Sequence, residues 1–191
     1  EFIEDAISTV DNSVRRMSRL LEQLRHGGSP DLTRRVKVTQ LCEEVAEQCG
    51  QRRPKVTVYS EEPEAEIRAS RDGLAAVFGH VIRNAQDAAG ADGEVSIKIS
   101  RQDADVVVEV LDNGSGMDEY FIRERLFRPF ESTKGSKGMG IGAYQAREFV
   151  RAAGGDVEVD STLGQGTVFR LIFPLAQSVQ QGVARKTGAI R

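Results

Sequence analysis

The order of secondary-structure elements is decided by residues 72–111, which read DGLAAVFGHVIRNAQDAAG over 72–90, EVSIKIS over 94–100 and DVVVEVL over 105–111. The first segment places apolar residues three and four apart, the spacing of a helix with one buried face. Asp72 is a candidate cap for its start, and Gly90 follows its end. The other two segments alternate β-branched and polar residues, which predicts a β-hairpin.

The segments on either side extend this pattern. Before the helix, Thr39 is a candidate cap for a helix that runs to about Cys49, and short strands are expected over 55–59 and 67–69. After the hairpin, a helix is expected up to about Ala153, followed by strands over 157–159 and 168–173. Because the two hairpins are not separated into alternating βαβ units, the sequence predicts an α+β fold. We expect a mainly antiparallel sheet with three helices over one face.

Composition excludes several classes of protein. The chain has 191 residues, with 26 Lys and Arg against 29 Asp and Glu and a net charge of −3. This balance is unfavourable for nucleic-acid binding, and no run of about 18 apolar residues predicts a membrane span or a signal peptide. Cys42 and Cys49 lie seven residues apart on one expected helix, too far for a disulfide, so we interpret them as reduced buried residues in a cytosolic protein.

Residues 1–27 have a different pattern. Their apolar residues follow steps of four and three, which is typical of a coiled-coil or bundle helix that ends at Gly27 and Gly28. Such a stripe favours dimerisation, although packing back on the same chain is an alternative. We therefore divide the chain into a dimerisation helix (1–28), a linker (29–35), a catalytic domain (36–175) and a polar tail (176–191), and we expect a fragment of a longer protein.

Two segments suggest ligand chemistry near the long helix. Asn84 follows an apolar stretch of that helix, where an amide requires a partner, and its side-chain oxygen is a hard ligand suited to Mg²⁺. A helix-surface asparagine with its amide in water is the alternative. Asp112 ends a strand and is followed by Gly114 and Gly116, which allow a flat ring to approach the backbone. A carboxylate there is a suitable acceptor for the amino group of adenine, although taken alone Asp-Asn-Gly is also a common turn.

Two further segments are rich in glycine. Gly138, Gly140 and Gly142 precede a helix, where exposed N–H groups and the helix dipole attract phosphate. A Rossmann site is disfavoured, because this segment does not follow a strand. Gly164 to Thr167 opens the last strand and places a hydroxyl near its start.

In this order and spacing, these segments resemble the boxes of the ATP-binding domain of the GHKL superfamily, and within it most closely those of sensor histidine kinases. Residues 80–88 are similar to the asparagine box, 112–117 to the first glycine box, 127–134 to the phenylalanine box, 138–142 to the second glycine box and 164–167 to the last. The resemblance covers about residues 36–175. It implies a two-layer α/β sandwich of the Bergerat type, with a lid over about 117–138.

The resemblance also implies a role for each residue of the site. Asn84 would bind Mg²⁺, Asp112 would accept from adenine, and Thr167 would assist at the base through its hydroxyl. Lys134 would neutralise phosphate charge, and Asp87 is assigned to the nucleotide pocket. The remaining assignments are backbone contacts to the base by Gly114 and Gly116, phosphate contacts by Gly138, Gly140 and Gly142, a second phosphate cation at Lys137, and lid anchors at Phe127 and Phe130, which equally fit as core aromatics.

For the longer protein, the resemblance implies that residues 1–28 are the second helix of a dimerisation and phosphoacceptor hairpin, of a type similar to kinases of PEP-CTERM and exopolysaccharide systems. The acceptor histidine is expected on the absent first helix. The family has an acidic residue just after this histidine on a helix, whereas His26 is followed by two glycines. This fragment should therefore bind ATP and Mg²⁺ without phosphorylating itself. The implied partners are a second copy of the chain, bound through residues 1–27, and the receiver domain of a response regulator. This segment is expected in the cytoplasm, and attachment of the parent protein to a membrane is left open.

His80 separates the reaction types that the resemblance allows. Hydrolytic members of the superfamily commonly have a glutamate four residues before the magnesium asparagine, whereas this chain has His80 there. A histidine kinase does not require a strong base, because the incoming imidazole is the nucleophile. We favour a kinase, with His80, Asn84 and Lys134 as catalytic candidates, and His80 equally fits as a packed helix residue. The alternatives are a GHKL ATPase, a serine kinase and a degenerate regulatory module that binds nucleotide.

Overall fold

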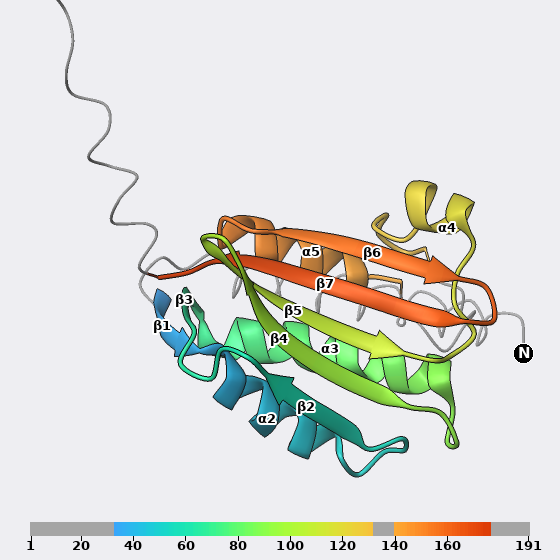
Figure 1. The fold of residues 1–191 in the computed structure, drawn as a ribbon. Coiled ribbons are helices and arrows are strands. Elements are labelled where there is room, and N and C mark those ends of the chain that lie inside the picture. The colour runs from blue at the N-terminus through green and yellow to red at the C-terminus, as the bar shows by residue number, and fades with distance from the viewer. Residues whose placement is uncertain (1–32, 132–139, 177–191) are drawn as a thin grey trace, which may run out of the picture.

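The computed structural model describes residues 33–131 and 140–176 (Figure 1). The predicted dimerisation helix and most of the polar tail lie outside these residues. The strands are β1 (Thr33–Lys37), β2 (Val56–Ser60), β3 (Glu66–Ser70), β4 (Val95–Gln102), β5 (Asp105–Asp112), β6 (Asp156–Thr162) and β7 (Gly166–Pro174). The helices are α2 (Val38–Cys49), α3 (Arg71–Ala89), α4 (Glu119–Glu124) and α5 (Gly142–Ala152).

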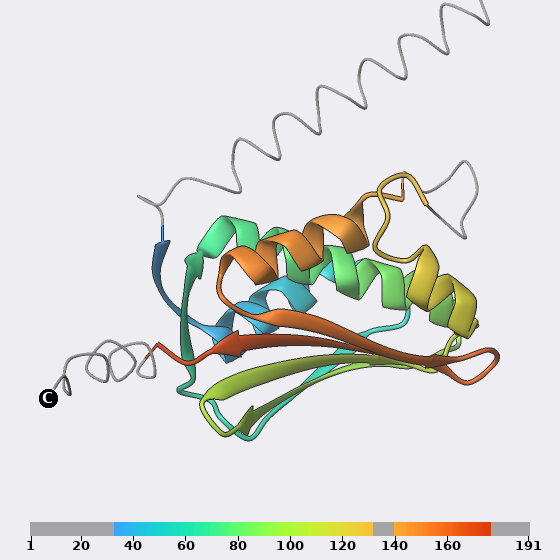
Figure 2. The same ribbon diagram turned by 90° about the horizontal axis from the view of Figure 1, so that it is seen from above.

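Five strands form one sheet in the order β2-β4-β5-β7-β6, and β1 pairs with β3 in a second, two-stranded sheet. The pair β2–β4 is parallel and the other pairs are antiparallel. Helices α2, α3 and α5 cover the same face of the large sheet, which the view from above shows most clearly (Figure 2). The predicted mixed, mainly antiparallel sheet with three helices on one face is confirmed.

The hydrophobic core lies between the sheet and these helices. In the central strand β5, Val106 and Val108 are fully buried. They share one face of the strand because successive side chains point to opposite faces, and Val107 between them is buried as well. Phe78 of α3 meets Phe173 of β7 edge to face, with 6.5 Å between ring centroids. The core therefore fixes helix α3 over the centre of the sheet.

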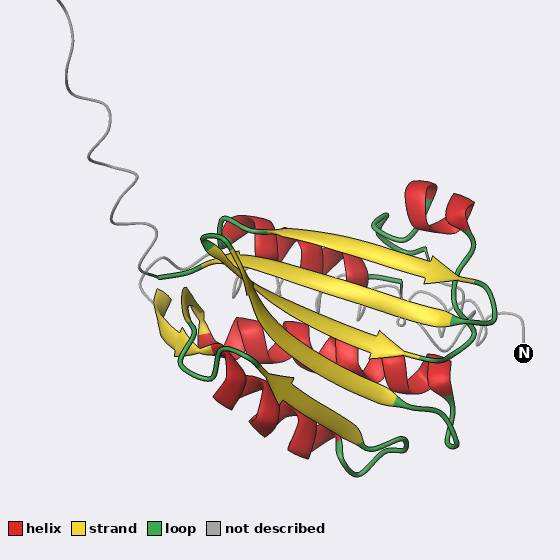
Figure 3. Ribbon diagram, viewed as in Figure 1, coloured by secondary structure: helices red, strands yellow, loops and turns green. Residues whose placement is uncertain are grey.

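Some local predictions were wrong. Thr39 does not cap α2: it is buried, and its hydroxyl lies 2.8 Å from that of Ser60. The cap of α3 is Ser70, whose side chain accepts from the N–H of Gly73, so the helix begins before Asp72. Strand β1 was not predicted and starts within the expected linker, and α4 was not predicted within the expected lid (Figure 3).

Cys42 and Cys49 are both buried, and neither forms a disulfide, as predicted from their spacing. Among the helices of the described part, none is long and apolar enough to cross a bilayer.

Candidate nucleotide site

Helix α3 carries the first two residues of the site. Asn84 and His80 lie one turn apart on this helix, and both are half-buried. The amide nitrogen Nδ2 of Asn84 is 2.7 Å from Nε2 of His80. The two side chains therefore lie close together, as predicted, and the Asn84 amide contacts the His80 imidazole.

Asp87 follows on the same helix but has a different environment. It is exposed, and its carboxylate accepts a hydrogen bond of 3.2 Å from Arg52, which lies between α2 and β2. In this arrangement Asp87 is held by an ion pair at the surface. A contact with nucleotide would require Asp87 to leave Arg52.

Asp112 ends the central strand β5 beside helix α3. Its Oδ1 accepts from the backbone N–H of Gly114 at 2.9 Å. Burial raises the pKa of the Asp112 carboxyl above its ordinary value, while hydrogen bonds from the backbone N–H groups of Gly114 and Thr167 act in the opposite direction. A half-buried carboxylate with acceptor capacity at a strand end suits recognition of a donor such as an exocyclic amine.

The turn after Asp112 is packed between two elements. The N–H of Ser115 donates to the carbonyl of Ala88 at the end of α3, at 3.2 Å. A Cβ on Gly114 would lie 2.3 Å from the carbonyl carbon of Ala88, and one on Gly116 would lie 2.0 Å from the carbonyl oxygen of Thr162. Both predicted glycines are therefore required by close backbone approach.

Ser161 belongs to the site but was not predicted. Its hydroxyl accepts from the N–H of Met117 at 2.9 Å and lies 2.9 Å from the hydroxyl of Thr167. It also bonds the carbonyl of Gly166 at 2.8 Å. Thr167 in turn lies directly opposite Asp112 in the β5–β7 register. Ser161 thus joins the predicted residue Thr167 to the turn after Asp112.

The second glycine-rich segment lies at the start of α5. Gly140 has a φ of +63°, and its carbonyl accepts from the N–H of Phe130 at 2.9 Å. Gly142 is the first residue of α5, and a Cβ there would lie 1.8 Å from two atoms of the His80 ring. Lys134, Lys137 and Gly138 lie outside the described residues.

The two aromatic residues of the phenylalanine box differ. Phe127 packs against Phe169 of β7, with ring centroids 6.3 Å apart, and the guanidinium of Arg147 lies 4.3 Å from the centre of its ring. Phe130 is 60% exposed and has a φ of +70°. Phe127 therefore behaves as a core aromatic, whereas Phe130 is at the surface.

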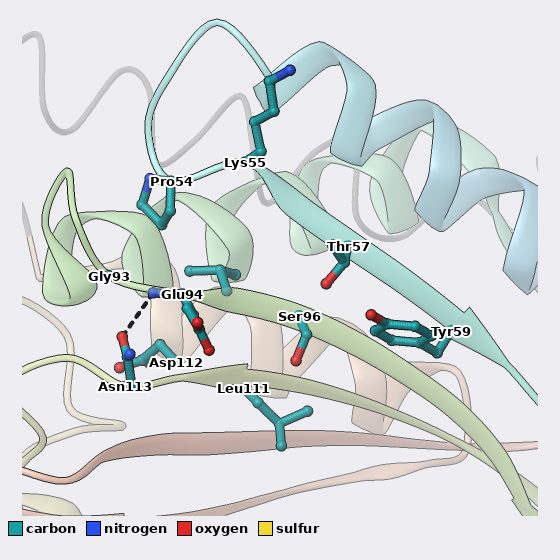
Figure 4. Close-up of a pocket in the computed structure, with 11 residues that line it drawn as sticks. Pro54, Lys55, Thr57, Tyr59, Gly93, Glu94, Ser96, Leu111, Asp112 and Asn113 are labelled. Atoms are coloured by element: carbon teal, nitrogen blue, oxygen red, sulfur yellow. Dashed lines mark hydrogen bonds between the residues drawn. The ribbon is translucent and has the colours of Figure 1, made fainter.

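A cavity of about 590 Å³ lies on the other face of the sheet, where Thr57, Tyr59 and Ser96 point away from the helices (Figure 4). Of the predicted site residues that the structure describes, Asp112 alone lines it. Asn113, at its edge, accepts from the N–H of Glu94 at 2.8 Å. The cavity is thus separate from the side of the sheet where His80 lies beside Asn84 and Gly142.

The fold and the site define a nucleotide-binding α/β sandwich. An asparagine on the central helix and a glycine-rich entry into another helix both lie beside His80 on one side of the sheet, and an acidic residue lies at the neighbouring strand end. The chain belongs to the family of histidine kinase-, DNA gyrase B-, and HSP90-like ATPases, which matches residues 69–177. The predicted GHKL domain is confirmed.

Several curated relatives are sensor kinases. Sensor histidine kinase CitA of Klebsiella pneumoniae is 30% identical over 110 residues, which are 56% of this chain and 20% of CitA. Signal transduction histidine-protein kinase AtoS of Escherichia coli (strain K12) is 33% identical over 118 residues, 61% of this chain and 19% of AtoS. The chain spans about a fifth of the length of these relatives.

Solved structures share the fold. The mycobacterial sensor histidine kinase MprB matches with a TM-score of 0.67 at 20% identity, over 75% of this chain and 97% of that one. Full-length ShkA in complex with AMPPNP matches with a TM-score of 0.71 at 24% identity, over 91% of this chain and 39% of that one. The predicted two-layer sandwich is confirmed by these similarities.

Proposed function

We propose that this domain is the catalytic and ATP-binding part of a sensor histidine kinase, which transfers the γ-phosphoryl group of Mg·ATP to a histidine on a dimerisation helix. The observation that carries this proposal is the His80–Asn84 pair on α3. An imidazole stands there in place of the glutamate of hydrolytic superfamily members. Transfer to an imidazole nucleophile depends on positioning and charge neutralisation rather than on a strong base.

The adenine would be held at the end of β5. Asp112 would accept from its amino group, with Gly114 and Gly116 leaving room for the ring. Thr167 would contribute through its hydroxyl, which Ser161 holds in place. The bonds from Gly114 and Thr167 orient the Asp112 carboxylate before a base arrives, so less ordering is required on binding.

The phosphates would lie between α3 and the start of α5. The amide nitrogen of Asn84 contacts His80, so its oxygen is the atom suited to Mg²⁺, a hard cation that prefers oxygen. When bound, Mg²⁺ would neutralise phosphate charge. Gly140 and Gly142 would contribute backbone N–H groups at a helix N-terminus. We propose the same kind of contact for Gly138, and we propose that Lys134 and Lys137 neutralise phosphate charge.

The proposal also covers the longer protein. Residues 1–28 would belong to a dimerisation hairpin, and the phosphoryl group would pass to the receiver domain of a response regulator in the cytoplasm. Of the two histidines in the chain, His26 precedes two glycines and His80 lies in the nucleotide helix. We expect neither to accept phosphate, so the purified chain would not label itself.

The test is transfer from γ-labelled ATP with Mg²⁺ to the parent protein's dimerisation hairpin, supplied separately. We expect label on the hairpin, and none with Asn84→Ala. Fast release of inorganic phosphate without the hairpin would instead indicate an ATPase. Tight binding of AMPPNP with neither transfer nor hydrolysis, using a hairpin that a full-length kinase labels, would indicate a regulatory nucleotide-binding module.

A further inference from the structure

The side chain of His80 lies between the two elements that form the phosphate half of the site. Its Nε2 is 2.7 Å from Nδ2 of Asn84, one turn further along α3. At the start of α5, a Cβ built on Gly142 would lie 1.8 Å from both Cε1 and Nε2 of the ring. The imidazole therefore occupies the space where any side chain at position 142 would begin.

This contact determines which end of the Asn84 amide faces His80. A side-chain amide has donors on nitrogen and lone pairs on oxygen, and a neutral imidazole has one donor and one acceptor nitrogen. In the structure Nδ2 of Asn84 faces the ring, and since this nitrogen can only donate, Nε2 of His80 is the acceptor of the contact. The reverse orientation would use the amide oxygen on the ring and turn an NH₂ group, which cannot bind a cation, toward the metal.

Gly142 is required by the ring rather than by its own backbone. Its φ is not among the positive values found in the described residues, so an alanine is compatible with the backbone there. The three atoms nearest to a Cβ at this position all belong to His80. Since side-chain rings rotate more easily than backbone moves, an added methyl group is expected to displace the ring and not the helix.

We infer that His80 is a positioning residue: it holds the Asn84 amide with its oxygen turned toward the metal, and position 142 is glycine so that the ring can remain there. This inference rests on the proposed role of Asn84 in binding Mg²⁺. It assigns His80 neither a general-base role nor only a packing role. It also makes the asparagine box and the second glycine box dependent on one another.

The first experiment measures the affinity for AMPPNP by calorimetry, with Mg²⁺ and with EDTA, and takes the ratio of the two dissociation constants as the magnesium gain. In His80→Leu, the contact between the ring and the Asn84 amide is removed, and the magnesium gain is expected to fall about tenfold while metal-free binding changes less than about twofold. His80→Gln, which places an acceptor at similar reach, should keep most of the gain. Arg83→Leu, on the exposed side of α3, is the matched control and should change neither quantity.

The second experiment is a double-mutant cycle. Gly142→Ala alone is expected to reduce the magnesium gain as much as His80→Leu does, because the methyl group displaces the ring. In a His80→Ala chain, the same change should cost nothing further, since the ring is gone. An equal loss in both backgrounds would overturn the proposed contact. Should His80→Leu not fold, this cycle and His80→Gln still test the same contact.

The outcomes separate this inference from the proposed function. A native chain with no magnesium gain would contradict the proposed function itself. A gain that disappears in Asn84→Ala but survives in His80→Leu would leave the metal role intact and reject the positioning role of His80 alone.

Discussion

Three glycines of the site are packed against different kinds of neighbour. Gly114 and Gly116 lie against main chain, the carbonyls of Ala88 and Thr162. Gly142 lies against a side chain, the ring of His80. Main chain within a helix or a strand pair cannot shift without breaking its hydrogen bonds, whereas a ring can rotate. A side chain in the first turn should therefore damage the fold, and one at Gly142 should damage ligand binding.

The largest effect is expected for Gly116→Ala. The residue has a φ of +64°, and the new methyl group would meet the carbonyl oxygen of Thr162 at 2.0 Å. Strain and overlap together should lower the free energy of unfolding by about 3 kcal/mol or more, measured by urea denaturation. Gly164→Ala is the control, because φ there is +76° but nothing lies within 4 Å. We expect about 1–2 kcal/mol for it, and equal losses would show that overlap is unimportant.

Ser161→Ala should have the next largest effect. It leaves the N–H of Met117 and the hydroxyl of Thr167 without the partner that Ser161 provides. The expected loss in the free energy of unfolding is about 1–2 kcal/mol, measured in the same way. Ser96→Ala, on the outer face of the sheet, is a matched control with a much smaller expected loss. Equal losses would mean that the hydrogen bonds of Ser161 do not stabilise the first turn.

Gly142→Ala should change the free energy of unfolding by less than about 1 kcal/mol, because alanine favours the helix and offsets the cost of moving the ring. Its main effect should be a smaller magnesium gain. Thermal unfolding of Gly142→Ala and Gly116→Ala, measured side by side, compares a glycine packed on a side chain with one packed on main chain. An equally large loss of stability in both variants would show that the kind of neighbour does not matter.

The smallest effect on stability is expected for Asp112→Asn, and it depends on pH. Burial raises the native pKa of Asp112 above its ordinary value of 3.8, so the native state holds the proton more tightly than the unfolded chain. The free energy of unfolding of the native chain should therefore decrease as pH rises from 3.8 through the raised pKa, and stay level above it.

The amide that Asp112→Asn introduces cannot titrate, so the variant should lack this decrease and equal or exceed the native chain in stability at neutral pH. Its affinity for AMPPNP should nevertheless fall, because an amide lacks the charge and the full acceptor capacity of the carboxylate. Urea titrations of both chains across this pH range test the slope. A native chain that gains stability relative to Asp112→Asn as pH rises would show that the pKa is lowered instead.

The sequence predicted elements whose stability comes from a local, periodic pattern. Helix α3 and the strands from Val95 to Asp112 each have a continuous buried face, so their type and order are correct. The pattern did not reveal β1, a short strand rich in arginine that is ordered through its pairing with β3. Nor did it reveal α4, which has six residues and a single buried one, Phe121.

The site was predicted to a similar extent. Asn84, Asp112 and the glycines could be found because each lies in a short segment with a distinctive composition. Ser161 could not, because its role depends on Met117, 44 residues earlier in the chain. Asp87 was singled out in the sequence, but its ion pair with Arg52 was not, because Arg52 lies in a loop that no local pattern connects to α3. The ligand contacts of all these site residues, and those of Lys134, Lys137 and Gly138, stay predictions.

Strand β3 has a consequence for protein engineering. Thr33, where the described chain enters, pairs with Ser70 at one end of β3, and the N–H of Ala176, where it leaves, donates to the carbonyl of Glu66 at the other end, at 2.8 Å. Five residues of strand span roughly 15 Å. A linker of modest length would therefore close residues 33–176 into a ring, and new termini could be opened at the β4–β5 turn, at the end of β5 away from Asp112. The same proximity makes this unit a suitable insert for a surface loop of another protein.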